Sequence, residues 1–206
     1  MKAAHSMVPR TNAGITLVEM MVALVIMSIG LLGLAGLQAA TAKYRINTMS
    51  RAAGTSLVFD LSERIRTNAD AAGPSFIQAG SSAVSQYVIS SDWTAQQKDS
   101  FTVTKNCNTE TCSSSERATF DLQTWRQKVR DSMPQGAAML SGNKRDGIVM
   151  TLMWFDKEFT DGSSDAKLLK APTCTNEQSG MAQQTCCPAE AKAVSGVRCS
   201  RFSFVP

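Results

Sequence analysis

The carboxylate of Glu19 is the one charged group in the otherwise apolar stretch from Ile15 to Leu37. Burying an unpaired charge in a low-dielectric environment costs free energy. An ionisable group at membrane depth is also functional more often than incidental. We therefore expect Glu19 to make a specific contact, and we consider it together with the preceding residues, Gly14 and Ile15.

Six cysteines are the second group of residues whose side chains could react or bind a metal. All of them lie in the second half of the chain: Cys107, Cys112, Cys174, Cys186, Cys187 and Cys199. This distribution favours disulfides formed in an oxidising compartment outside the cytoplasm. A zinc site is the competing interpretation. No histidine lies nearby and no C-x2-C pair occurs, so we expect no metal site.

The remaining composition argues against catalysis. The sole histidine, His5, lies in the first residues of the chain, and it would be lost if the chain were cut after Gly14. No nucleophile motif, glycine-rich phosphate loop or metal triad is present, so we expect neither an enzyme nor a cofactor. The formal net charge of +4 is spread without a solid basic block, which makes nucleic acid an unlikely partner.

The apolar stretch that contains Glu19 is long enough to cross a membrane. At about 1.5 Å per residue, a helix from Ile15 to Leu37 spans the roughly 30 Å hydrocarbon core. A secretory signal has a shorter apolar region, so the length favours a retained single-pass helix. Basic residues flank the stretch on both sides and do not settle its orientation: Lys2, Arg10, Lys43, Arg45 and Arg51. The cysteines place the C-terminal part on the oxidising side.

The segment GITLVE, Gly14 to Glu19, followed by an apolar run, resembles the leader of type IV pilins. An uncleaved membrane anchor with an accidental glutamate is the alternative. The resemblance implies that residues 1–14 are a cytoplasmic leader peptide, that prepilin peptidase cuts between Gly14 and Ile15, and that it methylates the new amine of Ile15. That charged amine would pair with Glu19, in its own subunit or in the one below, and favour one axial register.

One long helix is expected from Ile15 to about Asn68, ending near Gly73–Pro74 because proline disfavours helix in the residue before it. Residues 15–39 would form its transmembrane or filament-core part, and residues 40–73 an amphipathic continuation. Three glycines could add flexibility to the first part: Gly30, Gly33 and Gly36. An apolar stripe in the second part should pack against a globular head, with an Asp60–Arg64 pair on the other side: Ala53, Leu57, Val58, Leu61 and Ile65.

Residues 74–206 predict a small head. A helix is expected where apolar residues recur at helical spacing before Pro134 and Gly136: Leu122, Trp125, Val129 and Met133. The stretch GIVMTLMWFD is apolar on both faces, which favours a central strand covered by the long helix and joined in a hairpin to Ala137–Leu140. Shorter strands are expected at residues 86–90 and 101–104 and around Phe202 and Phe204, with a helical turn in the stretch SSDWTAQQKD, residues 90–99.

These elements predict an α+β protein with a type IV pilin-like fold: a long N-terminal helix, first transmembrane and then amphipathic, packed on a small antiparallel β-sheet head with disulfides. Several stretches narrow the resemblance over most of residues 14–156. They are GLLGLAGLQ in the span, the first cysteine pair, FDLQTWRQKVRDSMPQG, and a strand ending in MWFD. Together they resemble the PilV group of minor pilins, also called type IV pilus modification proteins.

The cysteines could form three disulfides in the head. Cys107 and Cys112 are close enough in sequence to close a small loop. A bridge between adjacent cysteines would be strained, so the four tail cysteines should pair in one of two ways. The alternatives are Cys174–Cys186 with Cys187–Cys199, or Cys174–Cys187 with Cys186–Cys199.

The resemblance implies a minor pilin in a membrane-anchored complex that initiates or caps a type IV pilus. Its partners would be other minor pilins, the major pilin, prepilin peptidase, the inner-membrane assembly platform and a pilus-tip adhesin. It would sit in a bacterial inner membrane with a periplasmic head before reaching the pilus. One alternative is a pseudopilin of type II secretion. Another is a head that binds DNA, a surface or an adhesin, for which the scattered basic residues give little support: Lys98, Lys105, Lys144 and Arg145.

Overall fold

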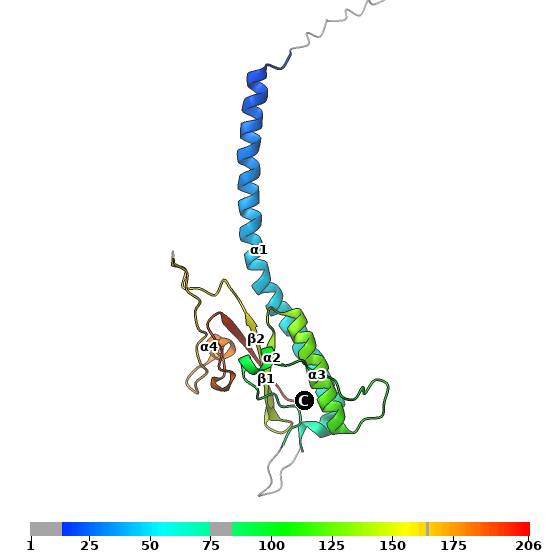
Figure 1. Ribbon diagram of the computed structural model, residues 1–206. Helices are drawn as coiled ribbons and strands as arrows, with labels where there is room; N and C mark the ends of the chain where they lie inside the picture. Colours follow the sequence, from blue (N-terminus) through cyan, green and yellow to red (C-terminus); the bar gives the residue numbers. More distant parts are fainter. Residues whose placement is uncertain (1–13, 75–83, 164) are drawn as a thin grey trace, which may run out of the picture. The chain divides into compact units, whose positions relative to one another are not determined.

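The computed structural model describes residues 14–74, 84–163 and 165–206, apart from the side chains of residues 43, 44, 46 and 47. All of the expected leader peptide except Gly14 lies outside these residues. The chain divides into two compact units, Met1–Tyr44 and Arg45–Pro206, and we call the second unit the head. Helix α1 (Leu17–Thr67) supplies residues to both units (Figure 1).

The first part of α1 is the candidate membrane span. The helix from Leu17 to Ala42 is long and apolar enough to cross a membrane; its most apolar window has a mean hydropathy of 2.4, and none of that window is buried within the protein. The helix passes without a break through Gly30, Gly33 and Gly36, and no neighbouring atom crowds the position of a Cβ at these glycines. Their contribution to flexibility therefore stays a prediction.

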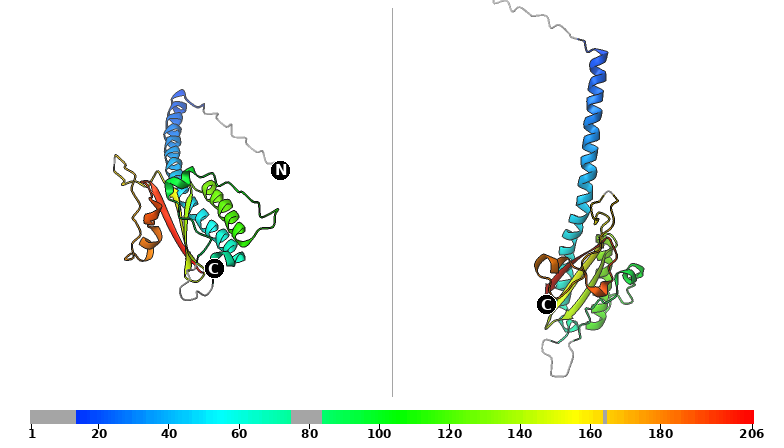
Figure 2. Two further views of the ribbon diagram at one scale, coloured as in Figure 1. Left: turned by 60° about the horizontal axis from the view of Figure 1, so that its bottom comes forward. Right: turned by 90° about the vertical axis from the view of Figure 1, so that its left-hand side faces the viewer.

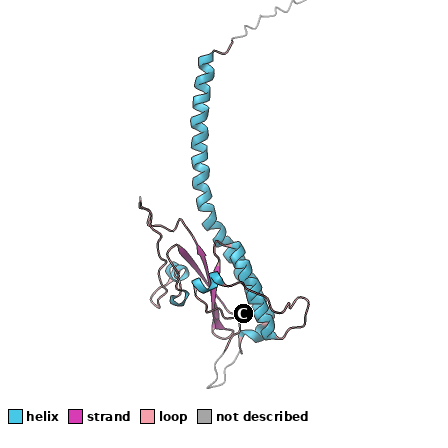
Figure 3. Ribbon diagram, viewed as in Figure 1, coloured by secondary structure: helices cyan, strands magenta, loops and turns pink. Residues whose placement is uncertain are grey.

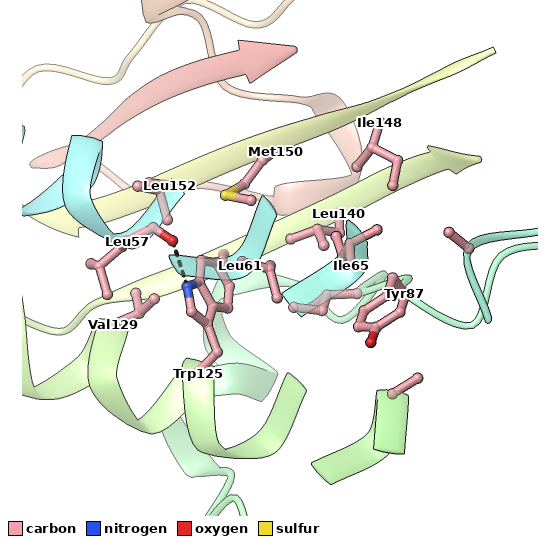
Figure 4. Packing of buried hydrophobic residues seen from close by; sticks show 14 of the residues in the cluster. Leu57, Leu61, Ile65, Tyr87, Trp125, Val129, Leu140, Ile148, Met150 and Leu152 are labelled. Atoms are coloured by element: carbon pink, nitrogen blue, oxygen red, sulfur yellow. Dashed lines mark hydrogen bonds between the residues drawn. The ribbon is translucent and has the colours of Figure 1, made fainter. Parts of the chain in front are cut away.

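In the head, the C-terminal part of α1 lies beside helix α3 (Ser114–Ser132). The predicted apolar stripe is confirmed, because Leu57, Leu61 and Ile65 are buried in the core. Trp125 of α3 is fully buried against this stripe, and its indole N–H donates to the Leu57 carbonyl oxygen over 2.8 Å (Figure 4). This bond satisfies the polar atom of a large aromatic side chain, which can then fill the core without an unpaired donor.

A polar network joins the same two helices. The buried carboxylate of Asp121 accepts hydrogen bonds from the Arg64 guanidinium over 3.0 Å and from the Tyr87 hydroxyl over 2.9 Å. Burial is the main cause of a raised pKa at Tyr87, so its hydroxyl stays protonated and remains a donor. Arg64 also contacts Asp60 over 3.3 Å, as the i, i+4 spacing predicts.

The sheet is antiparallel and has the order β1-β2-β3, formed by β1 (Ala137–Asn143), β2 (Gly147–Phe155) and β3 (Val197–Phe204) (Figure 3). The prediction that β2 is central is confirmed. One of its faces packs into the core formed with α1 through Ile148, Met150, Leu152 and Trp154. On the other face, Met153 belongs to a second cluster.

Glycine is required where β1 turns into β2. Gly142 has a φ of +97°, and a Cβ there would lie 2.1 Å from the carbonyl oxygen of Gly147. A residue with a side chain would therefore meet both a left-handed backbone and a clash with the main chain. The predicted hairpin between β1 and β2 is confirmed.

Two of the short strand predictions need correction. Within residues 86–90, only Ile89 forms a bridge, which pairs it with Leu140. Residues 101–104 form no strand, because Phe101 has a φ of +50° and its ring contacts two guanidinium groups of α3. Its ring centroid lies 4.1 Å from Arg126 Cζ and 4.3 Å from Arg130 Cζ. The left-handed backbone at Phe101 interrupts an extended run, and the cation–π contacts hold its ring against α3.

The helices predicted from the sequence agree more closely with the structure. The expected turn of helix is α2 (Trp93–Lys98), and the side chain of Asp92 caps it by accepting from the Ala95 N–H over 2.8 Å. Helix α1 ends at Thr67, before the expected Gly73–Pro74, and a 3₁₀ helix, η1 (Ala69–Ala72), covers most of the interval. Two short elements were not predicted, α4 (Gly180–Thr185) and the 3₁₀ helix η2 (Ala189–Ala191).

Three disulfides hold the loops of the head: Cys107–Cys112, Cys174–Cys186 and Cys187–Cys199. The tail pairing is thus the first of the two alternatives. It holds the segment that carries α4 at both ends, and it attaches Cys187 to β3 through Cys199. The long apolar helix and the small antiparallel sheet (Figure 2), together with the three disulfides, confirm an α+β, type IV pilin-like fold.

Helix α3 begins with a capping box that carries an additional ion pair. Ser113 is the N-cap; its hydroxyl accepts from the Glu116 N–H, and Glu116 Oε2 accepts from the Ser113 N–H over 2.8 Å. Lys105 Nζ lies 2.9 Å from Glu116 Oε1. The hydrogen bond from Lys105, followed by those from Ser113, lowers the pKa of Glu116 to about 2 from an ordinary value of 4.5.

We expect Glu116→Gln to reduce head stability at neutral pH by an amount that disappears in acid. Because the pKa of Glu116 is lower in the folded chain, the unfolded chain binds the proton first, and the stabilisation is lost as the pH falls from about 4.5 to about 2. Denaturant unfolding of the chain in detergent micelles, followed by tryptophan fluorescence, measures this difference. Glu177→Gln, in the exposed tail, is the control. A pH-independent difference between wild type and Glu116→Gln would contradict the prediction.

Candidate functional site

Helix α1 begins with a capping box built from Thr16 and Glu19. The Thr16 N–H donates to Glu19 Oε2 over 2.9 Å, and the Thr16 hydroxyl contacts the same oxygen over 3.0 Å. In return, the Glu19 N–H donates to the Thr16 hydroxyl over 3.2 Å. Two N–H groups that lack helical partners are thereby satisfied, and the helix is fixed to begin at Leu17.

Sequence reasoning missed Thr16. The pattern T-x-x-E directly before an apolar run is a known signal for a helix start, and it is present as Thr16 to Glu19. The prediction for Glu19 rested on its charge in an apolar run and did not include hydrogen bonds to neighbouring residues. Glu19 thus caps the start of α1 in the uncleaved chain, in addition to the ion pair expected from the sequence.

The peptide bond between Gly14 and Ile15 is open to an approaching enzyme. Both residues precede α1 and are exposed, and the Ile15 side chain is 73% exposed. No described atom lies within 4 Å of a Cβ placed at Gly14. Within residues 14–74, 84–163 and 165–206, nothing covers this bond.

The geometry leaves one carboxylate oxygen of Glu19 available. Both Thr16 donors reach Oε2, whereas Oε1 receives no hydrogen bond from the described residues. In the uncleaved chain the nitrogen of Ile15 is a neutral amide. Cleavage before Ile15 would convert this nitrogen to a charged amine close in sequence to the free oxygen. The site can therefore acquire an ion pair without giving up its cap.

We expect Thr16→Val to loosen the first turn of α1, because valine keeps the shape of threonine but lacks the hydroxyl. Removing an N-cap hydroxyl costs about 1 kcal/mol, so the Glu19 amide should exchange with solvent about fivefold faster. Hydrogen exchange measured by NMR on the uncleaved chain in micelles tests this expectation. Thr16→Ser keeps the hydroxyl and should behave like the wild type. Equal exchange rates in the two variants would contradict the capping role.

In the head, the residues that the structure describes include no comparable cluster of reactive groups. Among the described residues, no three histidine, cysteine, aspartate or glutamate side chains are placed to hold a metal ion. The cysteines whose positions suggested chemistry are all joined in disulfides.

A family model for the prokaryotic N-terminal methylation motif matches residues 9–35. No curated protein and no solved structure matches the chain. The matched segment contains Gly14, Ile15, Thr16 and Glu19, and it supports a type IV pilin-like protein that is processed by prepilin peptidase. Proteins with this motif are structural rather than catalytic. Together with the apolar helix, the motif indicates a membrane-anchored, single-pass protein.

Proposed function

We propose that this chain is a minor pilin of the PilV group, which joins a membrane-anchored complex that initiates or caps a type IV pilus. The observation that carries the proposal is the start of α1. There an exposed Gly14–Ile15 bond precedes a capped helix, and Glu19 keeps one free carboxylate oxygen. The family-model match over the same residues supports it, and so does the resemblance of the head to PilV proteins.

The proposed mechanism is an assembly contact that cleavage creates. Prepilin peptidase cuts after Gly14 and methylates the amine of Ile15, and this amine then pairs with Glu19 of its own subunit or of the one below. In an apolar filament core an unpaired charge is costly, so the pair favours the axial position at which both charges meet. The order of events is insertion, cleavage, methylation and packing.

The proposed setting follows from this mechanism. The chain spans a bacterial inner membrane with its head in the periplasm, where the three disulfides can form. Prepilin peptidase, the inner-membrane assembly platform, other minor pilins, the major pilin and a tip adhesin are its proposed partners. After assembly the head lies on the pilus at the cell surface.

Deleting the gene and counting surface pili by electron microscopy tests the proposed role. We expect few pili in the deletion strain, with normal numbers restored by the wild-type gene. Secretion of folded proteins into the medium should not change. Normal piliation together with reduced secretion would instead identify a pseudopilin of type II secretion.

A further inference from the structure

A groove of about 580 Å³ lies in the head between α1, the end of β3 and α4. Helix α1 contributes Phe59 and Arg66, and β3 contributes Arg201 and Phe202. Phe59 is 65% exposed, which is unusual for a large aromatic side chain. The groove therefore combines exposed aromatic surface with polar and basic side chains.

Strand β3 forms one wall of this groove and is an edge strand. It pairs with β2 on one side, and no backbone hydrogen bond joins residues Arg198 to Phe204 to any other described segment. Unpaired N–H and C=O groups on an edge strand are a template for a further strand. An extended peptide can use them for main-chain hydrogen bonds while its side chains enter the adjoining groove.

The charges of the groove define what it would bind. Arg66 and Arg201 line it, and no acidic side chain does. Arg66 already contacts Glu63 over 3.1 Å. Arg201 contacts no carboxylate among the described residues; its Nη1 lies 3.6 Å from Cys186 Sγ, and its buried Nε has no hydrogen-bond partner. Because the Arg201 side chain has no carboxylate partner among the described residues, its guanidinium can pair with a carboxylate from outside the chain through its Nη groups.

A second copy of the chain fits the groove poorly. Antiparallel pairing of two β3 strands would bring both Arg201 side chains to the same interface, and β3 has no acidic residue to compensate them. Like charges close together across paired strands are destabilising. The charge pattern thus favours a segment of different sequence.

We propose that the free edge of β3 binds an extended, acidic segment of another protein as an additional strand, and that Arg201 binds a carboxylate of that segment. Phe59 and Phe202 then cover its apolar side chains. Self-pairing of this chain along β3 is the competing occupant, and a peptide-binding experiment distinguishes the two.

The test uses the full chain in nonionic detergent micelles and a labelled peptide in which glutamate and valine alternate. A peptide with lysine in place of each glutamate is the matched probe. Fluorescence anisotropy should show binding of the acidic peptide only. Hydrogen exchange should show slower exchange of β3 amides when the peptide is bound. Binding should weaken with salt, as expected for an exposed ion pair.

Variants of Arg201 test whether the acidic peptide binds in the groove. Arg201→Gln should weaken binding of the acidic peptide about tenfold, whereas Arg201→Lys should retain most of it. Lys98→Gln, on α2 beside β1 at the other edge of the sheet, should have no effect. The proposal is overturned by equal binding of both peptides, by equal effects of the Arg201→Gln and Lys98→Gln changes, or by absence of binding. It is also overturned if β3 amides are protected by self-association in the absence of peptide.

Discussion

Replacing Glu19 with glutamine is expected to leave the protein in the membrane and to prevent its incorporation into filaments. Glutamine has nearly the same size and can replace glutamate in a capping box, so its side-chain oxygen can still accept the Thr16 hydrogen bonds. The substitution therefore removes the charge and keeps the helix start. In the assembled state, the methylated amine of Ile15 would be left without its partner.

The expected effect of Glu19→Gln is large. Removing one partner of a buried ion pair costs about 3 to 5 kcal/mol, because the other charge stays buried and uncompensated. The amount of protein in sheared surface filaments, relative to the amount in membranes, should fall by about two orders of magnitude or more. Glu63→Gln removes an exposed carboxylate of α1 in the head and should leave this ratio unchanged. Normal incorporation of Glu19→Gln would show that the charge has no role in assembly.

Replacing Trp125 with alanine is expected to destabilise the head severely. Trp125 is fully buried between α1 and the rest of the core, and its N–H is the donor to the Leu57 carbonyl. Truncating a buried tryptophan costs about 3 to 5 kcal/mol through the cavity and the lost apolar burial. The Leu57 carbonyl oxygen also loses a hydrogen-bond donor.

Denaturant unfolding of the full chain in micelles measures this effect. The midpoint for Trp125→Ala should shift strongly to lower denaturant, whereas Phe59→Ala should change the free energy of unfolding by about 0.5 kcal/mol or less, because Phe59 is largely exposed. Equal shifts in the two variants would mean that the Trp125 contact does not stabilise the head.

The spacing of apolar residues along the sequence was sufficient to predict the helix and strand that form most of the core. Leu57, Leu61 and Ile65 recur at helical spacing, and this spacing alone places them on one face of α1. The two apolar faces of β2 likewise indicate a strand covered on both sides, which its central position in the sheet confirms. Patterns of this kind depend on neighbours in the sequence and can be read without the fold.

Features that depend on distant residues could not be read in this way. The run at Phe101 has the composition of a strand, but Arg126 and Arg130 of α3 determine how its ring packs. The free edge of β3 becomes visible only when the strand order is known, and that order also defines the groove beside Arg201. The tail disulfide pairing depended in the same way on the placement of the segment that carries α4.

The residues of the candidate site could be predicted from local sequence, but their hydrogen bonds could not. Gly14, Ile15 and Glu19 were apparent from their types and spacing, and the family model covers the same residues. Thr16 carried an equally local signal, since its offset to Glu19 is that of a capping box. What the sequence could not provide is the distribution of hydrogen bonds over the two carboxylate oxygens, in which Thr16 reaches Oε2 and no described residue donates to Oε1.

Intact-mass analysis of protein extracted from membranes tests the central claim most directly. The predicted product begins at Ile15, lacks residues 1–14, carries one methyl group on its N-terminal amine and contains three disulfides. The same analysis in cells without prepilin peptidase should return the uncleaved, unmethylated chain. An uncleaved or unmethylated chain from cells with an active peptidase would contradict the assignment of Gly14–Ile15 as the processing site, and with it the assembly contact to Glu19.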